Sequence, residues 1–401
     1  MIYVVVALLV WGAQQTLAYD CSAHPWIDEA VQQWFRPSYE VARQSSKTIE
    51  ESLQAIADIK WGNYSTGKTL VVLWYDASTS EYRLRFEELH KHNEAHKPVG
   101  MQRVLERAVR QHNADLVAAL GKREMKFIFG TEDFPIVDPN MRLRVPSFQP
   151  CTTKGSVDVP VPDHSFELYS QASYTNHSWW EVRRLLLLKA ALLPWSHRQR
   201  ELFVRGDAGV GYRKTLLSIL HEARVNGSDL SLFGVHVNAH STGFYVSNRK
   251  HFTFLDNWCQ YRYLLHPSGL TYSISLKYKL ACGAVVLYFD HKYSEFYYPA
   301  LKPGVHLLSF PEAPREQFLT DVAPRVKAAI LRLEADHPTS PPPQALAARE
   351  FAASQLSDES LGCYWYSVLR AYAGLYFTES GAQVPQQVQL GDRNTTLNPT
   401  L

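Results

Sequence analysis

The sequence lacks the signatures of several common enzyme classes. Its 401 residues contain neither a G-x-S-x-G nucleophile motif nor an H-E-x-x-H zinc motif. Nucleophile-elbow hydrolases and zinc metalloproteases of that type therefore have no support. An excess of charge of one sign is also missing, because the formal net charge is only +2. No global field recruits nucleic acid or an anionic membrane, so an anion site must come from a local cluster of cations.

Long hydrophobic runs are missing as well, apart from one at the start of the chain. The run "MIYVVVALLVWGA" covers about a dozen residues, whereas roughly 20 are needed to span a bilayer. The small-residue pattern Thr16-x-Ala18 follows it, which favours a signal peptide over residues 1–18. A short signal-anchor is the alternative, since no Lys or Arg precedes the run, and we expect no stable transmembrane span.

Cysteine is scarce, and the few cysteines suit an oxidising compartment. Cys21, Cys151, Cys259, Cys282 and Cys363 allow two disulfides with one thiol left over. Glycosylation sequons begin at Asn63, Asn176, Asn226 and Asn394. They agree with passage through the secretory lumen, in the endoplasmic reticulum or Golgi, or with secretion. The final residues "NPTL" are not a retention signal of the KDEL type.

Helical and strand patterns alternate along the chain, which predicts an α/β protein of two halves with a cleft between them. The strand patterns lie at 69–76, 126–135, 201–206 and 284–290, and a helix-like pattern covers 261–269. The predicted divisions are 19–180 for the first half, 181–336 for the second, 337–344 for a Pro-rich break, 345–378 for final helices and 379–401 for a loose tail.

The stretch "ELFVRGDAGVGYRKTLL", residues 201–217, combines a strand, a glycine loop, cations and a helix start. These are the elements of a phosphate-binding loop, although the glycine spacing matches neither common nucleotide fingerprint. A solvated loop with surface arginines explains the composition equally well.

Acidic and histidine clusters offer further candidates with ordinary explanations. Asp133 follows a buried strand and could accept a proton, but its spacing alone favours a capping or turn role. His90, His92 and His96 lack the companions of a metal site, so we predict surface histidines and no bound metal.

From Asn257 onward, the sequence resembles the CAP10 domain of glycosyltransferase family 90, which includes protein O-glucosyltransferases. A Cys-x-Tyr-x-Tyr run, a Gly loop, a Ser/Lys helix and the run "EFYYPALKPGVH" follow one another in the family's order. "CYWYSVLRAY" resembles its C-terminal helix, and the resemblance extends over 21–376. The residues that carry it are Cys259, Tyr261, Tyr263, Gly269, Ser273, Lys277, Cys282, Glu295, Phe296, Tyr298, Pro299, Leu301, Pro303, His306, Cys363, Tyr364 and Trp365.

The resemblance implies a GT-B fold, in which two Rossmann-like domains face each other across a cleft. It also implies inverting, metal-independent transfer from UDP-glucose or UDP-xylose to a protein or polysaccharide hydroxyl, with no cofactor. Asp133 in "TEDFP" matches the family's catalytic base, which reverses the capping interpretation. The family's disulfide spacing matches Cys259–Cys282, with Cys21–Cys363 as the second pair.

The resemblance also assigns binding residues. The distance from Arg205-Gly206 to Arg213 is the one this family uses for its diphosphate loop. The predicted UDP-sugar residues are Arg205, Gly206, Asp207, Arg213, Gly269, Ser273, Ser275, Lys277 and Glu295. Those predicted on the acceptor and sugar side are Pro162, Asp163, Ser165 and Phe166.

Two departures from the animal enzymes concern donor and acceptor. Ser275 stands where those enzymes have an arginine that helps to hold the diphosphate, and their Trp/Gly-rich acceptor segment is absent. An inactive CAP10-domain protein that binds sugars or proteins is therefore the alternative function.

Overall fold

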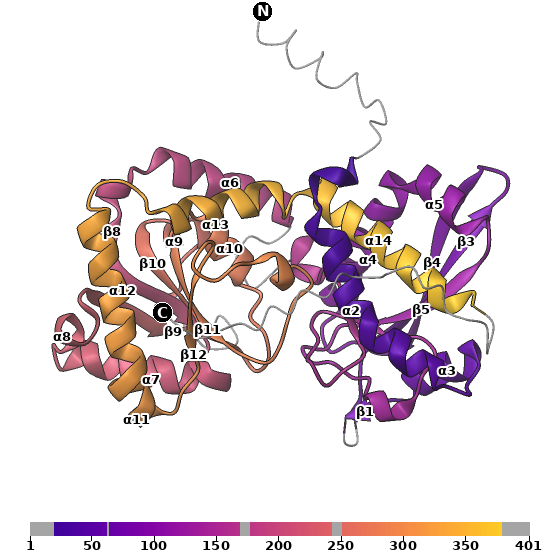
Figure 1. The fold of residues 1–401 in the computed structure, drawn as a ribbon, viewed down its shortest axis with the longest axis horizontal. Helices are drawn as coiled ribbons and strands as arrows, with labels where there is room; N and C mark the ends of the chain where they lie inside the picture. Colours follow the sequence, from indigo (N-terminus) through magenta and orange to yellow (C-terminus); the bar gives the residue numbers. More distant parts are fainter. Residues whose placement is uncertain (1–19, 62–63, 169–176, 243–250, 379–401) are drawn as a thin grey trace, which may run out of the picture.

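The fold is known from a computed structural model, which describes residues 20–61, 64–168, 177–242 and 251–378. Two α/β halves lie side by side along the long axis of the molecule (Figure 1). Each half is built on a sheet with five described strands. This mixed α/β architecture, with two sheets and flanking helices, is consistent with the GT-B class that the sequence predicts.

The sheet of the second half is parallel throughout its described strands, in the order β9-β8-β10-β11-β12. Its strand order reverses between β8 and β10, because β9 lies outside β8 while the later strands continue on the other side. Such a reversal opens a crevice at the carboxyl ends of the strands, where α/β proteins bind ligands. The elements are α6 (Trp179–Leu192), β8 (Gln199–Gly206), α7 (Gly211–Val225), α8 (Asp229–Phe233), β9 (His236–Ser241), α9 (Leu255–Trp258), β10 (Tyr261–His266), α10 (Leu276–Ala281), β11 (Val285–Asp290), β12 (Leu308–Pro311), α11 (Arg315–Gln317) and α12 (Ala323–Asp336).

The sheet of the first half is mixed rather than parallel, which departs from a regular Rossmann arrangement. Strand β3 runs antiparallel to both β4 and β5, whereas β6 runs parallel to both β5 and β7. Asp133, which follows β5, lines a cavity together with residues of the second half, so the segment after Gly130 lies at the boundary. The elements are α2 (Trp26–Arg43), α3 (Ile49–Ala57), β1 (Lys60–Trp61), β2 (Tyr64–Ser65), β3 (Lys68–Asp76), β4 (Glu81–His90), α4 (His96–Gln111), α5 (Asn113–Leu120), β5 (Met125–Gly130), β6 (Phe148–Gln149) and β7 (Val159–Pro160).

The final helices connect the halves. Helix α13 (Pro343–Ser354) packs on α6 and α10 of the second half, whereas α14 (Asp358–Tyr376) packs on α2 and α4 of the first. Figure 1 shows α14 returning along α2. Residues 337–342 of the predicted Pro-rich break connect α12 to α13, and its last two residues begin α13. The last described helix, α14, therefore belongs spatially to the first half.

Both predicted disulfides are present. Cys21–Cys363 ties the start of the first half to α14, and Cys259–Cys282 joins the end of α9 to the end of α10. Cys151 is the free and buried cysteine. The first crosslink holds the returning helix α14, and the second holds α9 against α10.

One local prediction from the sequence is wrong. The helix-like pattern over 261–269 forms strand β10 instead, because its alternate side chains face two different apolar cores. Tyr263 and Leu265 belong to one core and Tyr261 and Leu264 to the other, so no solvent-exposed face marks the strand. Helices α4 and α5 follow each other directly, since only His112 separates them.

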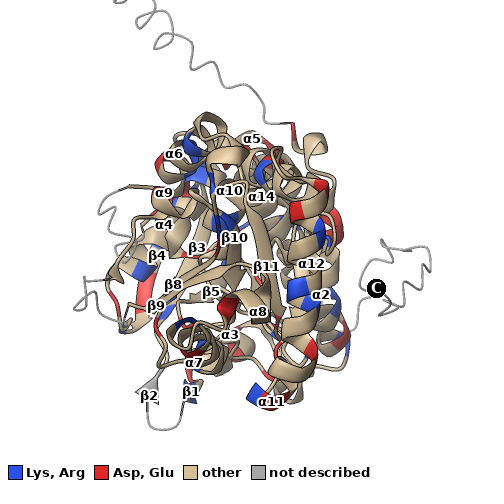
Figure 2. Cartoon of the chain, turned by 90° about the vertical axis from the view of Figure 1, so that its left-hand side faces the viewer, with Lys and Arg blue, Asp and Glu red and all other residues tan. Residues whose placement is uncertain are grey.

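Several sequence predictions fall outside the described residues: the signal segment 1–18, the tail 379–401 and the sequons at Asn63, Asn176 and Asn394. Asn226 is described, and it lies exposed in the turn after α7. No helix in the described part of the chain is long and apolar enough to cross a membrane. Basic and acidic residues are interspersed along the described elements (Figure 2).

Candidate active site

A cavity of about 330 Å³ opens at the strand-order reversal of the parallel sheet. Its walls come mainly from the segments that follow β8 and β10, and Asp133 of the other half completes them. Of the predicted donor residues, those that line the cavity are Arg205, Gly206, Asp207, Arg213, Gly269, Ser273 and Ser275. The fold therefore brings together residues up to about 140 positions apart in the sequence.

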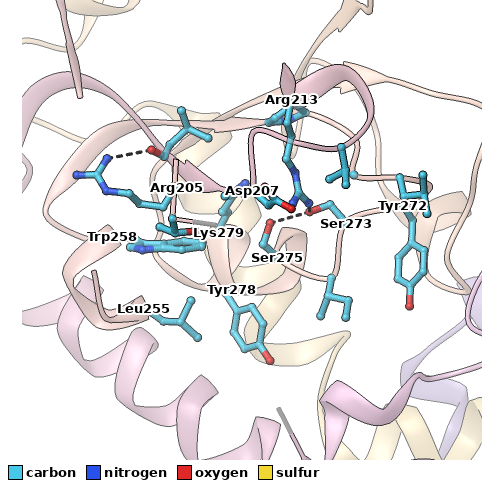
Figure 3. Close-up of a pocket in the computed structure, with 18 of the residues that line it drawn as sticks. Arg205, Asp207, Arg213, Leu255, Trp258, Tyr272, Ser273, Ser275, Tyr278 and Lys279 are labelled. Atoms are coloured by element: carbon cyan, nitrogen blue, oxygen red, sulfur yellow. Dashed lines mark hydrogen bonds between the residues drawn. The ribbon is translucent and has the colours of Figure 1, made fainter. Parts of the chain in front are cut away.

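Glycine allows the two cavity loops to meet. A Cβ on Gly211, where φ is +54°, would lie 1.7 Å from the carbonyl oxygen of Gly269. A Cβ on Gly269 would lie 3.1 Å from Nη2 of Arg213, whose guanidinium passes over that glycine. Arg213 donates to Oγ of Ser273 over 2.8 Å (Figure 3). No side chain larger than hydrogen fits at either glycine without moving backbone, so the glycines place this guanidinium in the cavity.

The second predicted arginine turns its charged group into the protein. Arg205 donates to the carbonyl oxygens of Val204, Asn238 and His251 and to the side-chain oxygen of Asn238, over 2.7–3.0 Å. Burial lowers its pKa to about 10. Its stem lines the cavity, but most of its donors are already used to join β8 to β9 and to the segment at His251. Arg205 therefore shapes the loop, and Arg213 is the arginine placed to meet an anion.

A lysine that sequence reasoning missed lines the cavity floor. Lys279 is 3% exposed and lies one helical turn after Ser275 on α10. Ser275 in turn hydrogen-bonds Ser273 over 3.0 Å. The i, i+4 spacing of Ser275 and Lys279 places both on one helix face, and this spacing is the signal that could have found the lysine.

Lys277 lies on the other side of the same helix and does not line the cavity. Its ammonium donates to Oγ of Ser165 and lies 4.0 Å from Asp163. Asp163 also accepts a hydrogen bond from Tyr272 over 3.2 Å. Burial alone would raise the pKa of Asp163, but the Lys277 charge and the Ser165 hydrogen bonds outweigh it and hold the pKa below its ordinary value. This buried group joins the two halves beside the cavity.

The predicted acceptor-side residues belong to that buried junction. Pro162, Asp163, Ser165 and Phe166 are all buried, and none of them lines the cavity. The ring of Phe166 lies 4.3 Å from the Lys277 ammonium. The structure thus places these four residues behind the cavity wall, where they support it.

Glu295 is also enclosed in protein rather than exposed to the cavity. It is 1% exposed and accepts hydrogen bonds from Tyr298 over 3.0 Å and Tyr297 over 3.4 Å. Burial, with a smaller contribution from Asp163, raises its pKa to about 8. A ribose contact by this carboxyl, as the resemblance suggests, would require the tyrosines to move.

Asp133 is the acid that faces the cavity from the first half. It follows β5, and 43% of its side chain is exposed. Desolvation within the cleft raises its pKa, while Lys97 opposes the rise from 3.3 Å away. A carboxylate with a raised pKa at the boundary of a cavity can accept a proton from a hydroxyl that enters there.

The segment before Asp133 is held by its own contacts. Thr131 hydrogen-bonds Nδ1 of His92 over 2.6 Å, and Thr69 bonds the opposite ring nitrogen over 2.9 Å. Glu132 accepts from the backbone N–H of Gly67 over 2.9 Å. His92 is 5% exposed, so the prediction of surface histidines is wrong for this residue. Its ring fixes the turn that carries Asp133.

Replacing Lys97 by methionine is expected to shift the acid limb of the pH profile of kcat/KM to higher pH. A carboxylate can serve as a base only when it is ionised, and loss of the neighbouring ammonium raises the pKa of Asp133 further. The measurement is kcat/KM against pH. Lys97→Arg keeps the charge and should keep the limb in place, as should Lys91→Met, which removes an exposed cation nearby. An unchanged limb in Lys97→Met would show that the ion pair does not tune the base.

The described residues offer no open metal site. The one group of three potential ligands within reach of one another is Cys21, His112 and Cys363. Its two cysteines are joined in a disulfide, so they provide no thiolate. His90, His92 and His96 do not form such a group.

The sequence also contains the spacing G-x-x-x-x-G-K-T from Gly62 to Thr69, which is that of a P-loop. The structure gives it another role. Lys68 is fully buried in β3 and donates to the carbonyl oxygens of Ala57 and Ile59, and Thr69 pairs with β5. A P-loop needs a helix after the lysine, whereas a strand occupies this position.

The chain was compared with known proteins. The model of "Glycosyl transferase family 90" matches residues 92–390. The chain is 29% identical to a protein O-glucosyltransferase 2 of Danio rerio over 187 residues, 46% of this chain and 35% of that protein. It is 25% identical to a protein O-glucosyltransferase 1 of Rattus norvegicus over 62% of each chain. It is also 25% identical to the O-glucosyltransferase rumi of Drosophila melanogaster, over 65% of this chain and 62% of that protein.

The match to these relatives is partial, since the chain spans less than two thirds of their length. The family model, in contrast, covers most of this chain, including Asp133 and every residue that lines the cavity. The chain belongs to glycosyl transferase family 90.

Proposed function

We propose that this protein is an inverting glycosyltransferase that transfers glucose or xylose from a UDP-sugar to a hydroxyl group. The observation that carries the proposal is a cavity at a strand-order reversal that is lined both by Arg213 of the second half and by Asp133 of the first half. A diphosphate and a reacting hydroxyl need these two groups on opposite sides of the transferred sugar. The names of the relatives favour a protein acceptor and glucose, with a glycan acceptor and xylose as the alternatives.

The chemistry follows from the charges. Asp133 takes the proton of the acceptor hydroxyl as its oxygen attacks the anomeric carbon. The bond from that carbon to the diphosphate oxygen breaks, and the electron pair leaves with UDP. Arg213 and the hydroxyls of Ser273 and Ser275 stabilise the negative charge that develops on the leaving group. We propose that this arrangement needs no metal or cofactor.

The apolar side of the cavity suits the nucleobase. Phe252, Leu255 and Trp258 line it, and their flat or branched side chains offer apolar contact area. The two disulfides and the exposed sequon at Asn226 support a location in the secretory lumen, where such bonds form. We propose that nucleic acid is not among the partners of this protein.

A donor panel tests the proposal. Purified protein is incubated with UDP-glucose, UDP-xylose and other UDP-sugars, with EGF-like repeats or glycans as acceptors. UDP release that depends on both donor and acceptor is the expected result. Binding of a UDP-sugar without release under any acceptor condition would favour the alternative, an inactive sugar-binding protein. The absence of binding to every UDP-sugar would refute the proposal.

Replacing Arg213 by alanine is expected to weaken UDP binding by about 1.5–3 kcal/mol, the contribution of a hydrogen bond to a charged group. The guanidinium lies over Gly269 in the cavity, so its loss removes a direct contact to the diphosphate. Titration calorimetry with UDP measures the change. Lys214→Ala removes the next cation, which is exposed and does not line the cavity, and should bind UDP like the wild type. Equal affinities for all three proteins would place the diphosphate elsewhere.

A further inference from the structure

Lys279 has an environment that is unusual for a lysine. Its side chain is almost completely buried at the cavity, and its Nζ donates to the carbonyl oxygen of Leu265 over 2.7 Å. It also lies 3.2 Å from Nδ1 of His266. An ammonium group has three N–H donors, so these two contacts leave one donor that can turn toward a ligand.

The charge of Lys279 has no counter-ion in the part of the chain that the structure describes. No carboxylate there lies within 4.0 Å of its ammonium, whereas Lys277 on the same helix has Asp163 at that distance. The charged group that acts most on Lys279 is Arg213, another cation. Burial and this repulsion hold the pKa of Lys279 well below its ordinary value.

The neighbouring side chains recorded in contact with Lys279, His266 and Trp258, are not acidic. His266 of β10 has its pKa held well below the ordinary value by burial and by Lys279, and its ring stacks on Tyr288 of β11. Trp258 of α9 presents its ring 5.7 Å away. Lys279, which is buried, and Arg213, which is partly buried, line one cavity together with the acids Asp207 and Asp133. Since neither acid lies within 4.0 Å of the Lys279 ammonium, an anion bound between the two cations would lower the cost of burying that charge.

We propose that Lys279 binds the diphosphate of the donor together with Arg213, so that the anion is held between α10 and the start of α7. Figure 3 shows Lys279 between Trp258 and the Ser273–Ser275 pair, with Arg213 approaching from the opposite side. The small side chain of Ser275, one turn earlier, leaves the ammonium accessible to the ligand. The proposal rests on the proposed UDP-sugar function and adds a residue to its binding site.

Two variants separate a ligand contact from a structural role. Lys279→Met removes the charge and the donor, whereas Lys279→Gln removes the charge but keeps a donor that can reach Leu265. The probes are UDP, inorganic pyrophosphate and uridine, each titrated calorimetrically. Both variants are expected to bind UDP and pyrophosphate roughly 10–100-fold more weakly than the wild type, while their affinity for uridine is retained. Lys214→Met is the matched control and should bind all probes like the wild type.

The outcomes distinguish this inference from the function on which it rests. Wild-type UDP affinity in either folded variant would overturn the role of Lys279 and leave the proposed function intact. An equal loss for uridine and UDP would assign Lys279 to the structure of the cavity and overturn the proposal as well. If the wild type binds neither UDP nor pyrophosphate, the proposed function fails first, and the role of Lys279 fails with it.

Discussion

Replacing Asp133 by asparagine is expected to lower the turnover number by roughly 10²–10⁴-fold, the usual contribution of a general base. The amide has nearly the same shape but cannot accept the proton of the acceptor hydroxyl. UDP affinity should stay close to the wild-type value, because Asp133 comes from the half opposite the diphosphate loop and carries no positive charge. Initial rates of UDP release measure the first effect, and calorimetry with UDP measures the second.

Glu124→Gln provides the matched control for this substitution. Glu124 is an exposed acid just before the start of β5, at the end of the strand remote from Asp133. Its replacement should leave both turnover and UDP affinity unchanged. Wild-type turnover in Asp133→Asn would show that another group is the base. Loss of UDP binding together with turnover would instead indicate that the asparagine disturbs the cavity.

The parallel sheet shows which parts of the fold were predictable. Strands such as β3 and β8 could be predicted because their apolar runs are short and end at turns or acidic residues. Strand β10 could not, because both of its faces are buried and a buried run of six residues has no distinguishing period. The two-half organisation therefore follows from the sequence, but the position of the central strand needs the tertiary packing.

In the candidate site, too, some features could be predicted from the sequence and others could not. The spacing from Arg205 to Arg213 placed both arginines on the cavity, as the structure has them. Which guanidinium faces the cavity depends on Asn238 of another strand, whose two oxygen atoms accept hydrogen bonds from Arg205. Likewise, the side chains of residues two positions apart on a helix point about 200° away from each other. Lys277 and Lys279 therefore face opposite sides of α10. Sequence similarity alone gives no such orientation.

The second large effect concerns Lys277, the lysine of α10 that faces away from the cavity. Lys277→Met is expected to lower the free energy of unfolding by about 3–5 kcal/mol, the usual result of removing one partner of a buried ion pair. Asp163, which is 1% exposed, would keep its charge without the ammonium that compensates it. Chemical denaturation of the purified variant measures the loss.

A double-mutant cycle identifies the cause. Asp163→Asn alone should also destabilise, because it leaves the Lys277 ammonium buried without a charge partner. The double variant Lys277→Met/Asp163→Asn removes both charges, so it should be more stable than the sum of the two losses predicts. Additive losses would show that the two side chains do not stabilise each other across the boundary.

UDP binding by Lys277→Met decides between its two possible roles. The resemblance assigns this lysine to the donor, whereas its contacts with Ser165 and Asp163 assign it to the junction between the halves. If the junction role is correct, the folded variant binds UDP with an affinity close to that of the wild type, although it is less stable. A selective loss of UDP affinity over uridine affinity would instead support the donor role. It would then follow that Lys277 exchanges Asp163 for the diphosphate when the donor binds.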